Sequence, residues 1–200
     1  MREVLPDIWM WSWHSAPHNY NFNGHLLCLP QGNLVIDPVE VPPDVLAELA
    51  RRGVARILLT NRNHGRDVNR VRSRTGARTA IHPADAAHAR GQGAVIDDEL
   101  RTGEAIGPLS VVGAAGKSPG EVSFHWPDRR ILIVGDVIVG NPPGACSLLR
   151  EQVMDDPPLL RASVRRLLEL DFDTLLVGDG EPILHGARER LRELVATFSG

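Results

Sequence analysis

The sequence of 200 residues predicts an α/β fold in a single domain, residues 1–200. Three observations lead to this class. The chain opens with strand-like segments separated by turns, residues 55–90 then alternate strand and helix patterns at the spacing of βα units, and further strand patterns precede a final helix, strand and helix. Two mixed β-sheets, packed face to face with helices outside, accommodate this order.

Antiparallel strands are expected at the N-terminus. Residues 3–13 contain three tryptophans, which we interpret as a packing cluster on one or two edge strands, because tryptophan buries a large area. Residues 14–21 are polar and are expected to form a loop, and residues 22–30 read as the next strand. A Gln-Gly-Asn turn at residues 31–33 joins that strand to a partner at residues 34–37.

The βα units follow this hairpin. A helix is expected to begin at the Pro42-Pro43 pair, because the amides of a first helical turn have no partner and proline therefore costs nothing there. It runs to Arg52, and Gly53 ends it. The other elements expected in this half are a strand at 55–60, a helix at 67–75, a strand at 78–82 and a helix at 83–90.

The second half begins with an acidic, loop-like stretch at residues 95–106. Asp156 can cap a helix that has Pro157 at its first position, and the leucines and valine that follow form one apolar stripe. The other elements expected in this half are strands at 109–112, 121–126, 130–134 and 174–177, and a last helix with its apolar face between residues 187 and 198.

Composition limits the classes of function. The formal net charge of −3 gives no indication of a nucleic-acid partner, and no stretch approaches the ~18 consecutive apolar residues of a membrane span. The N-terminus does not read as a signal peptide, and Cys28 and Cys146 form neither a disulfide framework nor a metal-ligand spacing. We therefore expect a cytoplasmic protein with a small-molecule ligand. The tryptophan-rich N-terminus could also support a homo-oligomer.

The strand at 55–60 ends abruptly in polar residues, and such a strand end is where open α/β sheets place their sites. This loop and four other segments together resemble the metallo-β-lactamase superfamily, in its glyoxalase II-like branch, over most of the chain. The resemblance implies a four-layer αββα sandwich of two mixed β-sheets. The five segments are 22–27 with 34–38 (the opening hairpin), 58–60 (the strand before the metal motif), 116–120 (Gly-Lys-Ser-Pro-Gly), 133–136 (Ile-Val-Gly-Asp) and 177–180 (Val-Gly-Asp-Gly).

The same resemblance implies that the family's dinuclear zinc site is largely lost. The family has a His-x-His-x-Asp-His motif, a Gly-His-Ser-Pro-Gly loop and a final Gly-His-Gly. Of the ligand positions only Asp136, which corresponds to the aspartate that bridges two metals, is unchanged. The remaining ligand positions carry Asn61, Asn63, Gly65, Arg66, Lys117 and Asp179. Two carboxylates beside two cations do not make a zinc site, which needs about three His, Cys or carboxylate ligands.

We interpret Arg66 and Lys117 as counter-ions that replace the metals beside Asp136 and Asp179, since a buried carboxylate without a partner is costly. No cofactor is then expected, and metal-dependent hydrolysis would be weak or absent. The alternative is that both cations are solvated surface charges. The predicted ligand is small and anionic, and the residues expected to bind it are Asn61, Asn63, His64, Arg66, Lys117, Asp136 and Asp179.

Two other functions stay open. One divalent metal (zinc, manganese or iron) could be held by Asp136, Asp179 and His64 or His185, and could activate water to hydrolyse an ester, thioester or lactone. Without metal, a half-buried Lys117 could act as a base or nucleophile. The catalytic residues are therefore left open, with Asp136, Lys117 and His64 as the candidates. A scaffold protein with a vestigial pocket and an oligomer contact is the third possibility, and whether the chain is an enzyme stays open.

Overall fold

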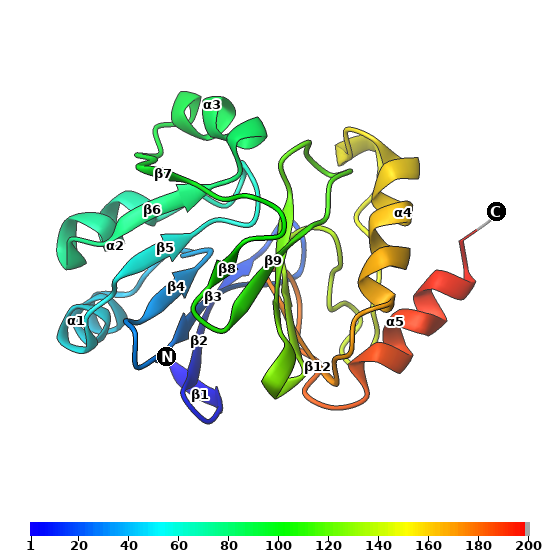
Figure 1. Cartoon of the computed structure of the whole chain (residues 1–200), viewed down its shortest axis with the longest axis horizontal. Helices are drawn as coiled ribbons and strands as arrows, with labels where there is room; N and C mark the ends of the chain where they lie inside the picture. The colour runs from blue at the N-terminus through cyan, green and yellow to red at the C-terminus, as the bar shows by residue number, and fades with distance from the viewer. Residues whose placement is uncertain (199–200) are drawn as a thin grey trace. The chain divides into compact units, whose positions relative to one another are not determined.

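The structure is a computed structural model that describes residues 1–198. Contacts divide the chain into two compact units, the first spanning Met1–Leu100 and the second beginning at Arg101. Each unit contains one mixed β-sheet and its own helices (Figure 1). The predicted α/β class with two mixed sheets is therefore confirmed, whereas the single domain stays a prediction.

The first unit has a seven-stranded sheet in the order β1-β2-β3-β4-β5-β6-β7. The strands from β1 to β4 pair antiparallel, and β5, β6 and β7 are added in parallel. The strands are β1 (Arg2–Leu5), β2 (Ile8–Ser15), β3 (Tyr20–Leu27), β4 (Leu34–Ile36), β5 (Arg56–Leu58), β6 (Arg78–Ile81) and β7 (Asp98–Glu99), and the helices are α1 (Pro43–Arg52), α2 (Val68–Thr75) and α3 (Pro83–Gly91).

Alternation along β3 assigns its side chains to two faces of this sheet. Phe22 and Leu26 belong to the apolar cluster that also contains Leu49 of α1, so they lie on the helix side. Gly24 lies between them on the same side, where a Cβ atom would come within 2.4 Å of the Trp11 ring. His25 consequently lies on the opposite face, where it is buried.

The second unit has a five-stranded sheet in the order β12-β11-β10-β9-β8. Only β11 and β12 are parallel, and the other neighbours are antiparallel. The N-terminal cap of α4 is the predicted one, because the Asp156 side chain accepts a hydrogen bond from the N–H of Leu159 at 2.9 Å. The elements are β8 (Ala105–Ile106), β9 (Leu109–Gly113), β10 (Val122–Trp126), β11 (Ile131–Val134), β12 (Thr174–Val177), α4 (Pro157–Leu168) and α5 (Ala187–Ala196).

Two expected loops are partly strand. The expected loop at 14–21 shrinks to four residues, because β2 and β3 stay paired up to Ser15 and Tyr20. Polar side chains support this end of the ladder, since the Ser12 hydroxyl donates to Asn23 Oδ1 at 2.7 Å across the strands. The expected loop at 95–106 contains the short strands β7 and β8.

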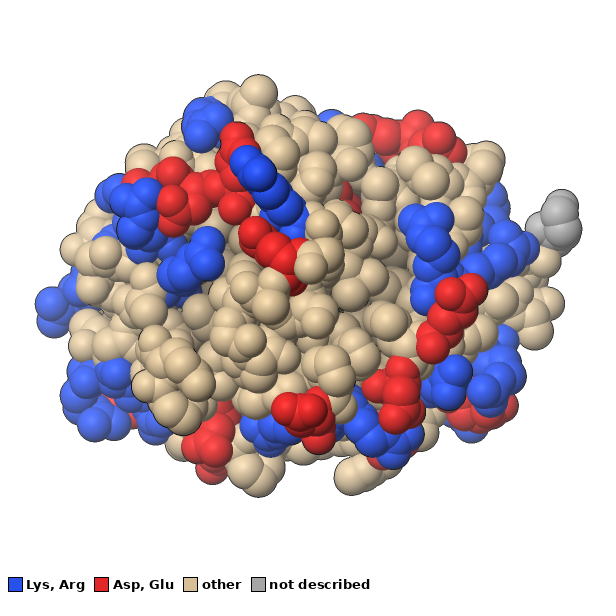
Figure 2. Space-filling model, viewed as in Figure 1, with Lys and Arg blue, Asp and Glu red and all other residues tan. Residues whose placement is uncertain are grey.

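Acidic and basic side chains are interspersed on the face of the molecule shown in Figure 2, and no large area of one sign stands out. This distribution agrees with the small formal net charge of −3. Among residues 1–198, no helix combines the length and the apolar character needed to cross a bilayer.

Candidate functional site

In the first unit, Asp37 organises the loop that follows β5. Its Oδ1 accepts the backbone N–H of Thr60 at 2.8 Å, and its Oδ2 accepts the Thr60 hydroxyl at 2.6 Å. The same Oδ2 lies 2.8 Å from Nδ1 of His64, and all three side chains are buried. A carboxylate at hydrogen-bond distance from Nδ1 favours a proton on that nitrogen and fixes the orientation of the ring. The structure therefore places His64 as an oriented, buried imidazole.

Asn61 and Asn63 have different surroundings in this loop. Asn61 is buried, and its Oδ1 accepts the backbone N–H of Asn63 at 2.9 Å. That bond identifies Nδ2 as the other end of the amide, and Nδ2 has no hydrogen-bond partner among the described residues. Asn63 is exposed. Asn61 is thus a buried donor that a ligand oxygen could satisfy.

Arg66 is not the buried counter-ion that we expected. The residue is exposed, and its guanidinium carbon lies 4.1 Å from the centroid of the Phe22 ring, as a cation–π contact. The neighbouring Gly65 packs closely, since a Cβ atom there would lie 3.1 Å from the Cβ of Ala94. A metal-binding side chain at position 65 would therefore require Ala94 to move.

In the second unit, Lys117 and Asp136 form a buried ion pair. Lys117 Nζ lies 2.9 Å from Asp136 Oδ2, and the two side chains are 8% and 6% exposed. Gly116 permits this placement of Lys117, because it adopts φ +142° and a Cβ atom there would lie 2.3 Å from the backbone of Leu160. Lys117 is therefore a buried counter-ion of Asp136, as predicted, and it is not a solvated surface charge.

Asp136 and Asp179 come together because β11 and β12 are parallel neighbours, in register at Val134 and Val177. Each aspartate follows the carboxyl end of its strand, and both are buried, with carboxylate oxygens within 4.8 Å of each other. The loops behind them also meet, since the N–H of Gly140 donates to the backbone carbonyl of Asp179 at 2.9 Å. The structure thus assembles Lys117, Asp136 and Asp179 at one end of this sheet.

Two buried carboxylates that support these loops were not among the predicted site residues. Glu121 Oε1 accepts the backbone N–H of Val137 at 2.8 Å and so holds the chain directly after Asp136. In the first unit, Asp85 of α3 accepts the backbone N–H of Arg62 at 2.9 Å. A single acidic residue at the start of a strand or on a helix carries no local signal, so the sequence did not indicate either role.

His185 does not lie with Asp136 and Asp179. Its side chain is 88% exposed, and its Nδ1 lies 3.5 Å from Asp173 Oδ2. Asp173 directly precedes β12, whereas Asp179 follows the opposite end of that strand, and four strand residues span roughly 13 Å. The structure therefore corrects the expectation that His185 could share a metal with the two aspartates.

The donor set of the second unit does not fit the dinuclear centre that the resemblance implies. Asp136 and Asp179 supply two carboxylates, but the Lys117 ammonium already lies 2.9 Å from Asp136. A divalent cation bound to Asp136 would meet that positive charge at close range. In the first unit, Gly65 offers no side-chain donor, and Asn61 and Asn63 offer neutral amides, which are poor ligands for zinc.

Sequence comparisons agree with this architecture. A family model described as the metallo-β-lactamase superfamily matches residues 2–198. A hydroxyacylglutathione hydrolase of Cereibacter sphaeroides is 31% identical over 166 residues, which cover 77% of this chain and 59% of that protein. One from a Methylobacterium species is 31% identical over 175 residues, with 78% and 64% covered. The chain thus spans about three fifths of the length of these curated relatives.

Solved structures show the same fold. A metallo-β-lactamase from Pontibacter korlensis superposes with a TM-score of 0.80 at 15% identity and covers 98% of both chains. The structure of TTHA1623 in a di-iron-bound form has a TM-score of 0.67 at 26% identity, with 90% of this chain and 98% of that chain covered. With the family model matching almost every residue, this chain belongs to the metallo-β-lactamase superfamily.

Proposed function

We propose that this chain binds a small anionic ligand and has little or no metal-dependent hydrolytic activity. The observation that carries the proposal is the buried ion pair between Lys117 and Asp136, at 2.9 Å. By resemblance, Lys117 stands at the position of a ligand histidine and Asp136 at that of the bridging aspartate. A metal at Asp136 would have to displace the ammonium or strip its proton, and either change leaves a buried group poorly compensated.

The loop after β5 supports an anionic, oxygen-rich ligand. Asn61 Nδ2 is a buried donor without a partner among residues 1–198, and a buried donor left in that state costs about 1–3 kcal/mol. An oxygen atom of a ligand would satisfy it. Arg66 and Asn63, which are exposed on the same loop, add a positive charge and a second amide.

The test is the metal content of the full chain, purified without chelator and then offered zinc, manganese and iron. We expect far less than one metal ion per chain, and no hydrolysis of a hydroxyacylglutathione thioester by the metal-treated protein. The Cereibacter sphaeroides relative is the positive control for the hydrolysis assay. Stoichiometric metal that disappears in Asp136→Asn would contradict the proposal.

Metal-dependent hydrolysis with one divalent ion is the second candidate function. It is favoured by the two buried carboxylates of Asp136 and Asp179, whose oxygens lie within 4.8 Å of each other. The names of the curated relatives and the di-iron form of TTHA1623 point the same way. For this candidate Lys117 would have to leave Asp136, and the third expected ligand, His64, stays a prediction.

A further inference from the structure

We propose that the helix-covered side of the first unit carries a separate binding site, for an organic anion whose carboxylate or phosphate group is attached to an apolar chain. The site is the groove between α1 and α2, two helices that pack side by side (Figure 1). The inference goes beyond the proposed function, because neither the loop after β5 nor the ion pair of the second unit takes part in it.

The groove combines positive charge with an apolar wall, and its volume is about 390 Å³. Leu46 of α1 forms the apolar wall and is partly buried against the core of this unit. The other described residues that line the groove come from α2, and none of them is acidic: Asn69, Arg70, Ser73 and Arg74. The aliphatic stems of the two arginines can extend the apolar wall. Such a groove matches an anion that also has an apolar portion.

The helical period explains why these side chains of α2 share a face. Val68 and Val71 are buried in the core, so the opposite side of the helix faces outward. Arg70 and Arg74 lie one turn apart on that side, with the exposed Ser73 next to them. Two like charges at this spacing repel each other. An oxyanion bound between the two guanidinium groups would remove the repulsion.

Arg74 supplies a charge that the protein does not neutralise, because its guanidinium has no ion-pair or hydrogen-bond partner among residues 1–198. Arg70 donates through Nη1 to Asp67 Oδ2 at 2.9 Å, and the same oxygen accepts the N–H of Val41 at 2.8 Å. That contact occupies one of the five N–H groups of Arg70, so the others can bind a ligand oxygen. The Ser73 hydroxyl, which is likewise without a partner in the described part of the chain, is a third donor.

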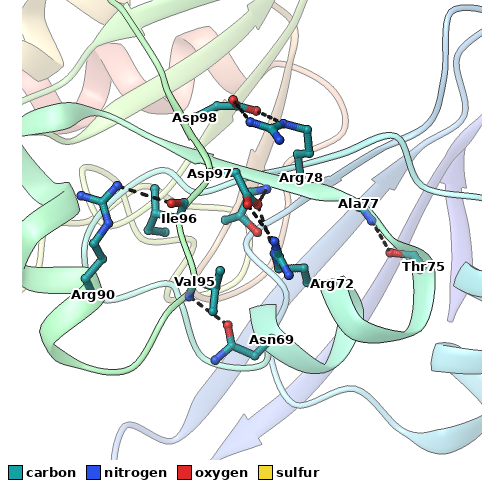
Figure 3. A network of polar contacts seen from close by, with 11 residues as sticks. Asn69, Arg72, Thr75, Ala77, Arg78, Arg90, Val95, Ile96, Asp97 and Asp98 are labelled. Atoms are coloured by element: carbon teal, nitrogen blue, oxygen red, sulfur yellow. Dashed lines mark hydrogen bonds and ion pairs between the residues drawn. The ribbon is translucent and has the colours of Figure 1, made fainter.

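Two further polar residues of α2 hold the helix in place instead of facing the ligand (Figure 3). Arg72 binds both carboxylate oxygens of Asp97, at 3.1 and 2.7 Å. Asn69 donates through Nδ2 to the carbonyl of Gly93 at 2.8 Å and accepts the N–H of Val95 through Oδ1 at 2.9 Å. A helix that is fixed before binding spares the ligand the entropic cost of ordering it.

Titration of the full chain with hexanoate and with hexyl phosphate, at constant ionic strength, tests the site. Two-dimensional amide NMR spectra give the location of binding and the dissociation constant, and they show whether each variant is folded. Acetate lacks the apolar chain, hexan-1-ol lacks the charge, and hexylammonium reverses it. The variants are Arg74→Gln and Ser73→Ala. Arg2→Gln is the matched control, because Arg2 is also exposed, has no partner among the described residues, and lies on β1 outside the groove.

We expect saturable shifts of the amides of Arg70, Ser73 and Arg74. The dissociation constant of hexanoate should rise at least roughly tenfold in Arg74→Gln, rise less in Ser73→Ala, and stay unchanged in Arg2→Gln. Acetate should bind at least about tenfold more weakly than hexanoate, because the burial of the chain is lost. Tighter binding of hexyl phosphate than of hexanoate would identify a phosphate as the preferred group, and the reverse a carboxylate.

The absence of a saturable shift with both hexanoate and hexyl phosphate would overturn the site. Equal weakening in Arg2→Gln and Arg74→Gln would also overturn it, because it would indicate a general effect of net charge. Binding of hexan-1-ol or hexylammonium as tight as that of hexanoate would show that the groove does not select an anion. These outcomes are independent of metal content, since a metal-loaded, hydrolytic chain would contradict the proposed function while leaving this titration interpretable.

Discussion

At the scale of single residues, the buried ion pair between Lys117 and Asp136 affects the stability of the second unit. A buried ion pair contributes little compared with apolar side chains of the same size, because both charges lose their hydration. Removal of one partner has a much larger effect, since the remaining charge keeps its desolvation cost. Lys117 is 8% and Asp136 6% exposed, so solvent cannot compensate for the missing partner.

The variant Lys117→Met should therefore lower the free energy of unfolding by about 3 kcal/mol, measured by urea denaturation at pH 7. The double variant Lys117→Met with Asp136→Asn is the control, and it should recover part of that loss because both charges are gone. A loss below ~0.5 kcal/mol, which is typical of surface substitutions, would show that Lys117 is not a buried counter-ion.

At the scale of elements, the segment between α3 and β7 depends on charged side chains from α2 and β6. The Arg72 guanidinium lowers the pKa of Asp97 to about 2, and the hydrogen bond from the N–H of Thr79 acts in the same direction. Arg78 and Asp98 form a parallel but more exposed pair at 2.6 Å. These contacts explain why an acidic stretch that reads as a loop can add β7 to the sheet.

Asp97→Asn should lower the free energy of unfolding by about 1–2 kcal/mol at pH 7, because two charge-assisted hydrogen bonds become weaker. The carboxyl pKa is depressed in the folded state, so this contribution is present above the unfolded value near 4 and is lost as pH falls toward 2. Asp98→Asn is the matched control, and its exposed ion pair should contribute less than about 1 kcal/mol. Urea denaturation measures the free energy of unfolding of both variants. An equal decrease in the two would contradict the special role of Asp97.

At the scale of the whole molecule, stability should depend on a histidine that faces away from the helices of the first unit. Burial lowers the pKa of His25 to about 4, although the nearby charge of Asp37 opposes the shift. Neither ring nitrogen has a hydrogen-bond partner among the described residues. The folded protein consequently resists protonation of this side chain, whereas the unfolded chain accepts the proton near pH 6.5.

The free energy of unfolding should therefore fall as pH decreases from 6.5 to 4, and His25 should account for roughly 3 kcal/mol of the loss at pH 4. The contribution is fully present above pH 6.5, because neither state then binds the proton. Denaturation curves of His25→Gln, which cannot titrate, should show a shallower pH dependence even if the variant is less stable throughout. Parallel curves for the two proteins would rule out this linkage.

Several predictions about the whole molecule remain predictions, namely a cytoplasmic location, a homo-oligomeric contact at the N-terminus and a single domain. The superfamily is established by a model match over residues 2–198. The activity of the hydroxyacylglutathione hydrolases does not follow from this, because the chain spans about three fifths of their length.

The sequence by itself determined the class of the fold and the order of nearly all strands and helices. These features are local, because hydrophobic period, turn residues, caps and short motifs are properties of neighbouring residues. The sequence also predicted the ion pair between Lys117 and Asp136, because both residues stand at positions that correspond to metal ligands in the family. The loop predicted at 14–21 was too long, because cross-strand pairing overrides the polarity of the segments at its two ends.

Only the tertiary structure decided where the isolated side chains lie. Arg66 stacks on Phe22 and is exposed, and His185 lies at the far end of β12, although both read as site residues in the sequence. Asp37 orients His64 from 27 positions away, and the Asn61 amide is buried without a partner for Nδ2. The physical reason is that the direction and partner of a side chain depend on which distant segments the fold brings beside it, and no local pattern encodes that.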